Sequence, residues 1–109
     1  MLSKTHRLAK DKDIQKTFAR GRSFFNPFFN VKFAPGDSVP RFTVVVSTKV
    51  SKKAVVRNRL KRLVREYLRT HLSEFKNGDH IIMLKPKAAT LPEQEVVGKL
   101  KEIFKRWKK

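Results

Sequence analysis

Basic side chains crowd the stretch from Lys49 to Arg69, and they offer the clearest chemistry in this sequence. The stretch holds nine Lys and Arg residues and a single acid, Glu66. Lysine ammonium groups bind phosphate oxygens as point charges, and the planar forks of arginine bind them in bidentate fashion. The triplet Arg57-Asn58-Arg59 adds an amide that can reach a phosphate or a base edge. The stretch therefore predicts a surface that binds nucleic acid.

Helical spacing sorts this stretch into two faces of one helix, expected to begin at a cap on Thr48 or Ser51 and to end near Leu72. One face is an apolar arc of roughly 120°, suited to burial; it comprises Val56, Leu60, Leu63, Val64, Tyr67 and Leu68. The other, which we call the cationic ridge, repeats at i, i+4 and comprises Lys53, Arg57, Lys61, Arg65 and Arg69. Like charges at this spacing cost a few tenths of a kcal/mol per pair, which a merely solvated face avoids by interleaving Glu. Phosphate binding explains the ridge better, and Asn58 and Arg62 broaden it.

The whole chain shares this basic character. It has 109 residues, with 27 Lys plus Arg against 9 Asp plus Glu, and a net charge of +18. A chain of this length forms one domain, residues 1–109, and gains from neutralisation by a polyanion. The balance favours nucleic acid as the partner, with an anionic membrane surface or an acidic protein as alternatives. Charge alone does not separate RNA from DNA.

Patterns typical of catalysis, metal binding or membrane insertion are missing from the sequence. The chain has no Cys, which excludes disulfides and thiolate metal sites. Its three His residues lie far apart, and its acids are scattered without the pairing of a two-metal nuclease site. No apolar run approaches the roughly 20 residues of a membrane span, and we find no signal peptide. We therefore expect no membrane segment, no catalytic residue and no metal site.

The elements that must position the basic helix alternate between helix and strand. A first helix is expected over Asp11–Ala19, capped by Asp11 and ended by Gly21. Extended segments are expected at Phe24–Phe33, Arg41–Ser47 and His80–Lys85, with a short extra strand near Ser23. A last amphipathic helix begins at a capping box in Thr90–Glu93 and carries Val96, Leu100, Ile103, Phe104 and Trp107. The order α-β-β-α-β-α predicts an α+β fold, a two-layer sandwich.

Alternation along the first two long strands gives the sheet one apolar face and one mixed face. The apolar face carries Phe29, Val31, Phe33, Phe42, Val44 and Val46 and should pack on the long and C-terminal helices. The mixed face carries Phe28, Asn30, Lys32, Thr43, Val45 and Ser47. Beside Ile14 and Phe18 of the first helix, it suits an extended single strand whose bases stack on rings. The alternative is a second, minor core in which the first helix simply covers the sheet.

The segments Val46–Lys49 and Ala54–Glu66 resemble the protein component of bacterial ribonuclease P. The second contains the run RNRxKRxxRE, which is highly specific to that family. Further matches at Arg7-Leu8, Asp13–Gly21 and Gly78–Lys87 extend the resemblance over nearly the whole chain. It implies an RNA–protein endonuclease that removes the 5′ leader of precursor tRNA. It also implies a left-handed crossover through the long helix, against the general preference for the opposite hand.

The resemblance also assigns roles. The catalytic RNA would be held by Lys53, Arg57, Asn58, Arg59, Lys61, Arg62, Arg65 and Arg69. The 5′ leader would lie in a groove between the first helix and the sheet, lined by Ile14, Phe18, Phe28, Asn30, Lys32, Thr43, Val45, Ser47 and Lys49. The RNA subunit would supply catalysis with Mg²⁺, and the protein would bind no cofactor.

The partners implied are the ribonuclease P RNA and precursor tRNA, in the cytoplasm, with neither DNA nor a membrane. One alternative is a ribosomal protein or general RNA chaperone without processing activity. Another is a small nuclease that acts alone, which the scattered acids disfavour.

Overall fold

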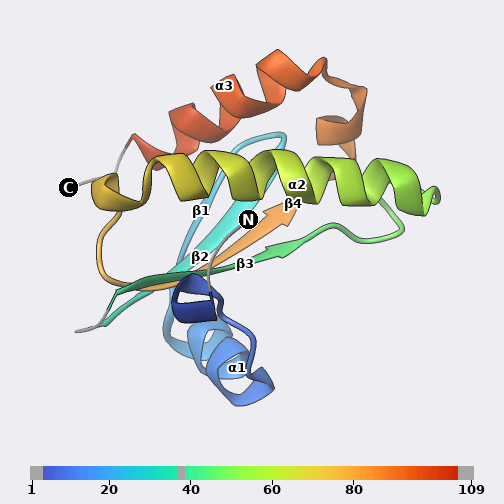
Figure 1. The fold of residues 1–109 in the computed structure, drawn as a ribbon. Helices are drawn as coiled ribbons and strands as arrows, with labels where there is room; N and C mark the ends of the chain where they lie inside the picture. Colours follow the sequence, from blue (N-terminus) through green and yellow to red (C-terminus); the bar gives the residue numbers. More distant parts are fainter. Residues whose placement is uncertain (1–3, 37–38, 106–109) are drawn as a thin grey trace.

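A mixed four-stranded sheet carries the fold in the computed structural model, which describes residues 4–36 and 39–105 (Figure 1). The strands are β1 (Arg22–Phe25), β2 (Phe29–Pro35), β3 (Pro40–Val45) and β4 (Gly78–Leu84). The helices are α1 (Asp11–Arg20), α2 (Ala54–Thr70) and α3 (Glu93–Phe104). Short 3₁₀ turns lie at Lys4–His6, Leu72–Glu74 and Pro86–Thr90. The expected order of elements is confirmed, including the short strand near Ser23, which is β1.

The strand order in the sheet is β1-β2-β4-β3. Neighbours β1 and β2, and β2 and β4, are antiparallel, whereas β3 and β4 are parallel. Because parallel neighbours need a long crossover, α2 connects β3 to β4 across one face of the sheet. The last strand of the chain therefore lies inside the sheet, and β3 lies at its edge.

The helices divide between the two faces of the sheet (Figure 1). Helices α2 and α3 lie together on one face, and α1 lies against the opposite face. The core forms under α2 and α3 from the expected apolar residues of both layers, with Phe29, Val31, Leu68 and Leu100 fully or almost fully buried. The α+β class and the layered packing of sheet and helices are thus confirmed.

Three expected helix caps are wrong. The residue before α2 is Lys53, and Ser51 instead accepts a hydrogen bond at Oγ from the Lys53 N–H at 3.2 Å. Helix α1 follows Lys10, so that Asp11 lies in the first turn, where its charge favours the helix dipole without capping it. The Thr90 hydroxyl donates to the Lys87 carbonyl at 2.7 Å, within the preceding 3₁₀ turn, and makes no capping box with Glu93.

The ends of the first and last helices follow the sequence more closely. Gly21 ends α1, with its N–H donating to the Thr17 carbonyl at 2.7 Å. A Cβ at Gly21 would lie 2.4 Å from that carbonyl oxygen, so this close approach requires glycine. In α3 the expected apolar stripe is buried at Val96, Leu100, Ile103 and Phe104, whereas Trp107 lies outside the described residues.

Candidate nucleic-acid interface

The cationic ridge follows α2 along the flank of its buried face. Leu60, Val64, Tyr67 and Leu68 are buried, as their spacing predicts. Lys61 and Arg65 are half-buried, so their stems lie along the protein while their charged ends reach outward. Farther around the helix, a surface hollow of about 500 Å³ is lined by Asn58, Lys61, Arg62, Arg65 and Glu66. The ridge therefore presents several cations and an amide on one side of one rigid element.

Two contacts hold the ends of the ridge. Near its start, Arg57 donates from Nη1 to the Ser51 carbonyl at 2.9 Å, which ties the ridge to the loop after β3. At its end, Arg69 donates from Nε to the Glu66 carboxylate at 3.1 Å. That hydrogen bond lowers the pKa of Glu66 and raises the pKa of Arg69. Glu66 thus offsets the charge of Arg69, and the concentrated positive charge lies between Lys53 and Arg65.

Arg59 does not belong to the ridge. Two residues along a helix turn the side chain by about 200°, so Arg59 lies on the opposite flank from Arg57. There its Nε lies 3.6 Å from the Glu93 carboxylate at the start of α3, and both side chains are more than half exposed. The two arginines of the RNR motif, Arg57 and Arg59, therefore lie on opposite sides of α2.

The mixed face of the sheet extends across all four strands, because β4 lies between β2 and β3 and β1 lies beyond β2. The register places Ile81 between Lys32 and Thr43 in one row across the sheet. The next row places Met83 between Asn30 and Val45. The expected alternation of β2 and β3 is confirmed, but Ile81 and Met83, which form the middle of this face, were not among the predicted site residues.

Helix α1 covers part of this face and leaves part of it open. Thr17 and Ile81 are almost fully buried where the helix lies on the sheet, which agrees with the interpretation of a minor core. Phe18 and Val45, however, keep 42% and 41% of their surface exposed. Helix α1 therefore forms a minor core with one part of this face and leaves another part open, as an apolar surface beside the Phe18 ring.

The other predicted leader residues fall into separate places. Ser47 and Lys49 are exposed in the loop between β3 and α2. Asn30 lies on the mixed face of the sheet, and its Oδ1 is buried without a hydrogen-bond partner among the described residues. Phe28 precedes β2 and lies beside α3, with the Lys99 ammonium 5.6 Å from its ring centroid. The structure therefore places Phe28 away from the α1 side of the sheet.

An ion-pair cluster fastens α1 to the sheet. The Arg41 guanidinium on β3 donates from Nε and Nη2 to the two carboxylate oxygens of Asp79 on β4, each at 2.8 Å. Its Nη1 lies 3.4 Å from the Asp13 carboxylate on α1. The hydrogen bond to Asp79 is the main reason that the pKa of Arg41 is raised. The cluster fixes the helix that carries Ile14 and Phe18.

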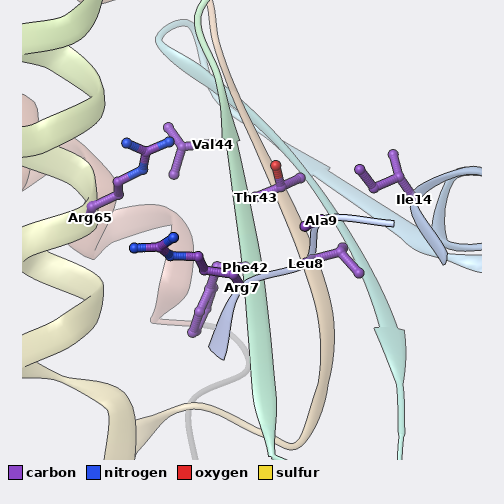
Figure 2. Close-up of a pocket in the computed structure, with 8 residues that line it drawn as sticks. All are labelled: Arg7, Leu8, Ala9, Ile14, Phe42, Thr43, Val44 and Arg65. Carbon is purple, nitrogen blue, oxygen red and sulfur yellow. The ribbon is translucent and has the colours of Figure 1, made fainter. Parts of the chain in front are cut away.

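The edge of the sheet joins the open face to the ridge (Figure 2). A pocket of about 230 Å³ lies there, lined by Arg7, Leu8, Ala9, Ile14, Phe42, Thr43, Val44 and Arg65. Arg65 enters from α2, Arg7 from the N-terminal segment, and Ile14 from α1 (Figure 2). The two surfaces predicted from the sequence are therefore continuous around β3.

A helix with a cationic flank beside a partly open sheet face defines a nucleic-acid-binding protein of the α+β class. The family model described as Ribonuclease P matches residues 2–108. The chain belongs to this family, the protein component of a tRNA-processing ribonucleoprotein with an RNA partner. Within the described residues, no helix is long and apolar enough to cross a membrane.

Curated relatives and solved structures agree with this assignment. The ribonuclease P protein component of Exiguobacterium sibiricum is 38% identical, covering 99% of this chain and 97% of the relative. That of Exiguobacterium sp. is 40% identical, with 98% and 94% covered. The RNase P protein of Staphylococcus aureus superimposes with a TM-score of 0.89 at 28% identity, over 94% and 95% of the two chains. That of Thermotoga maritima, in complex with 1-(4-fluorophenyl)-2-thiourea, gives 0.83 at 32% identity, over 92% and 98%.

Proposed function

We propose that this chain holds the ribonuclease P RNA on α2 and the 5′ leader of precursor tRNA on the open face beside α1. The observation that carries the proposal is the continuity of the two surfaces around β3. RNA bound to the cationic ridge leaves the neighbouring face accessible to a single strand. Arginine and lysine contacts to phosphates hold folded RNA without reading its sequence, whereas exposed rings suit unpaired bases.

The positions of these residues in the fold support a ranking of the proposed contacts. For the catalytic RNA, the strongest group is Arg57, Lys61 and Arg65, because these share one flank of α2 and Arg57 is held by a backbone carbonyl. Arg59 would contact RNA from the α3 side. For the leader, the proposed site consists of the two rows of residues across the mixed face of the sheet and the exposed ring of Phe18. Lys32 and Lys49 would supply phosphate contacts at its borders.

We assign the hydrolysis itself to the RNA subunit and its Mg²⁺. Within residues 4–36 and 39–105, no three His, Asp or Glu side chains are grouped to hold a metal ion. The carboxylates nearest the leader site, Asp13 and Asp79, are engaged by Arg41. We assign to this chain the binding and orientation of RNA, in the cytoplasm and in preference to DNA.

A cleavage assay tests the proposed function. Precursor tRNA is incubated with a bacterial ribonuclease P RNA at low Mg²⁺, with and without this protein. We expect the protein to stimulate release of the leader, because its cations offset the repulsion between two RNA molecules that Mg²⁺ otherwise screens. Absence of stimulation by any matched RNA subunit contradicts the proposal.

A second assay isolates the leader site through Phe18→Ala. We expect substrate affinity of the reconstituted complex to fall by about 1–3 kcal/mol for a precursor with a leader, the usual contribution of one stacked base. Affinity for a leaderless substrate should stay unchanged. Phe18→Tyr is the matched control, since it keeps an aromatic ring at the same position and should leave both affinities unchanged. An equal loss for both substrates contradicts the leader site.

A further inference from the structure

The pocket at the edge of β3 brings together two arginines that are 58 positions apart in the sequence, Arg7 and Arg65. Arg7 is held there by its backbone, which forms an isolated parallel bridge with Phe42. The neighbouring Leu8 N–H donates to the Phe42 carbonyl at 2.8 Å, and the Leu8 side chain is buried. The N-terminal segment is thus anchored, and the Arg7 side chain starts from a fixed position.

The backbone of β3 adds a hydrogen-bond donor to the pocket. Because the Phe42 carbonyl faces the N-terminal segment, the peptide groups of Phe42 point away from β4, and those of Val44 do the same two residues later. Val44 lines the pocket beyond the point where the N-terminal segment leaves the strand (Figure 2). Its outward N–H and the Thr43 hydroxyl add neutral donors to the two guanidinium groups.

The charge of the pocket indicates which kind of ligand it can bind. Two of the eight lining residues are arginines and none is acidic. Its volume of about 230 Å³ equals that of roughly eight liquid waters, enough for a phosphate with part of its sugar. A guanidinium pair with backbone and hydroxyl donors matches the oxygens of a phosphodiester.

We propose that this pocket binds one backbone phosphate of the 5′ leader, with Arg7 and Arg65 as its charged ligands. The inference rests on the proposed function, because Ile14 and Thr43 line both this pocket and the leader site. The phosphate marks the point where the leader crosses the sheet edge between the face under α1 and the flank of α2. Arg7, which the RNA-binding sets predicted from the sequence do not include, becomes a leader contact.

Substitution of Arg7 tests the pocket without disturbing the ridge. In the reconstituted complex, we expect Arg7→Gln to weaken binding of leader-bearing precursor about five- to tenfold and to leave leaderless substrate unaffected. Arg7→Lys should restore most of this affinity, since it keeps the charge. Arg22→Gln is the matched control, an exposed arginine on β1 at the opposite edge of the sheet. Thermal unfolding of each variant checks that the fold is retained.

A neutral linkage in the leader locates the phosphate. Methylphosphonate substituted at one leader position after another should weaken binding to the unaltered protein at one main linkage. With Arg7→Gln, the penalty at the same linkage should be clearly smaller, because one of the two charged partners of the phosphate is already gone. Equal penalties in both proteins overturn the proposal.

The outcomes also separate this proposal from the function on which it rests. If Arg7→Gln weakens leaderless and leader-bearing substrate equally, the pocket serves another part of the RNA and the proposal is wrong. If Arg7→Gln has no effect while Phe18→Ala still weakens only leader-bearing substrate, the pocket alone is overturned. If neither substitution distinguishes the substrates, the leader site itself is overturned.

Discussion

His80 shows how a single side chain couples this fold to pH. It is fully buried on β4, where its ring stacks on Phe42 at a centroid distance of 4.7 Å and lies 4.6 Å from Phe33. Its Nδ1 lies 3.3 Å from the Arg41 carbonyl, and its Nε2 has no partner among the described residues. Burial lowers the pKa of His80 to about 4, so the ring is neutral in the folded protein at pH 7.

This lowered pKa predicts a loss of stability in mild acid. The unfolded chain binds a proton at His80 below its usual pKa of about 6.5, whereas the folded chain binds it only near 4. The stabilising contribution is therefore complete above pH 6.5 and declines as the pH falls toward 4. Between pH 7 and pH 5 we expect a loss of roughly 1–2 kcal/mol from this residue.

Urea unfolding at the two pH values measures this effect. His80→Phe removes the titrating group but keeps a ring in the aromatic cluster, and it also removes the unpaired Nε2. The variant should lose less stability than the unaltered protein between pH 7 and pH 5. Equal losses in the two proteins would show that His80 is not the group responsible.

At the scale of elements, Arg41 decides how firmly α1 lies on the sheet. Arg41→Gln removes the cation that pairs with both Asp13 and Asp79 and leaves the two carboxylates without it. Because these groups are partly exposed, we expect a cost of only about 1 kcal/mol in global stability. Hydrogen exchange of α1 amides should accelerate several-fold while that of α2 stays unchanged, with Arg22→Gln as the control. Uniform acceleration across the protein would contradict a local role for the cluster.

The cationic ridge predicts a second effect at this scale. Replacement of Arg57, Lys61 and Arg65 by Gln should weaken binding to ribonuclease P RNA and lower the magnitude of its log–log salt slope by about 2–3, for three lost phosphate contacts. A triple replacement of Lys99, Lys101 and Lys105 by Gln at α3 is the control, since it removes the same charge from another helix. Similar slopes for the two variants would mean that net charge, not the ridge, determines binding.

Features that depend on the residue pattern within one helix or strand were predicted correctly from the sequence. Features that depend on how helices and strands pack against one another were not. The apolar faces of β2, β3, α2 and α3 follow from the spacing of hydrophobic residues, because burial repeats every two residues in a strand and every 3.6 residues in a helix. The position of β4 inside the sheet depends on pairing between strands that are far apart in the sequence. For this reason Ile81 and Met83, which lie in the middle of the mixed face, were not among the site residues predicted from the sequence. Both face the α1 side of the sheet by strict alternation from His80, a signal that can be interpreted once the strand order is known.

The other incorrect predictions also involve contacts with neighbouring segments of the chain. Phe28 lies just before its strand, where alternation no longer applies, and packing against α3 decides its direction. The RNR motif reads as one unit in the sequence, but the turn of α2 and the carboxylate of Glu93 separate Arg59 from Arg57. Caps failed because Ser51 and Thr90 bond to nearby backbone groups in turns, a competition that the sequence does not reveal.

At the scale of the whole molecule, the chain carries a net charge of +18, and the structure has a radius of gyration of 13.0 Å. The Debye length is about 30 Å at 0.01 M salt and about 8 Å at 0.15 M. At low salt, therefore, the excess positive charges repel one another across the whole protein, which destabilises the compact state. At physiological salt this repulsion acts only between neighbours.

Salt should consequently act in opposite directions on folding and on RNA binding. Between 0.01 and 0.15 M salt the melting temperature of the free protein should rise, because screening relieves self-repulsion. Over the same range RNA affinity should fall with a log–log slope of about −4 to −5, for roughly six neutralised phosphates. Calorimetry and filter binding on one preparation measure both effects. Parallel changes would mean that salt alters RNA binding through the amount of folded protein, whereas opposite changes assign the charge to RNA recognition at a cost in the stability of the free chain.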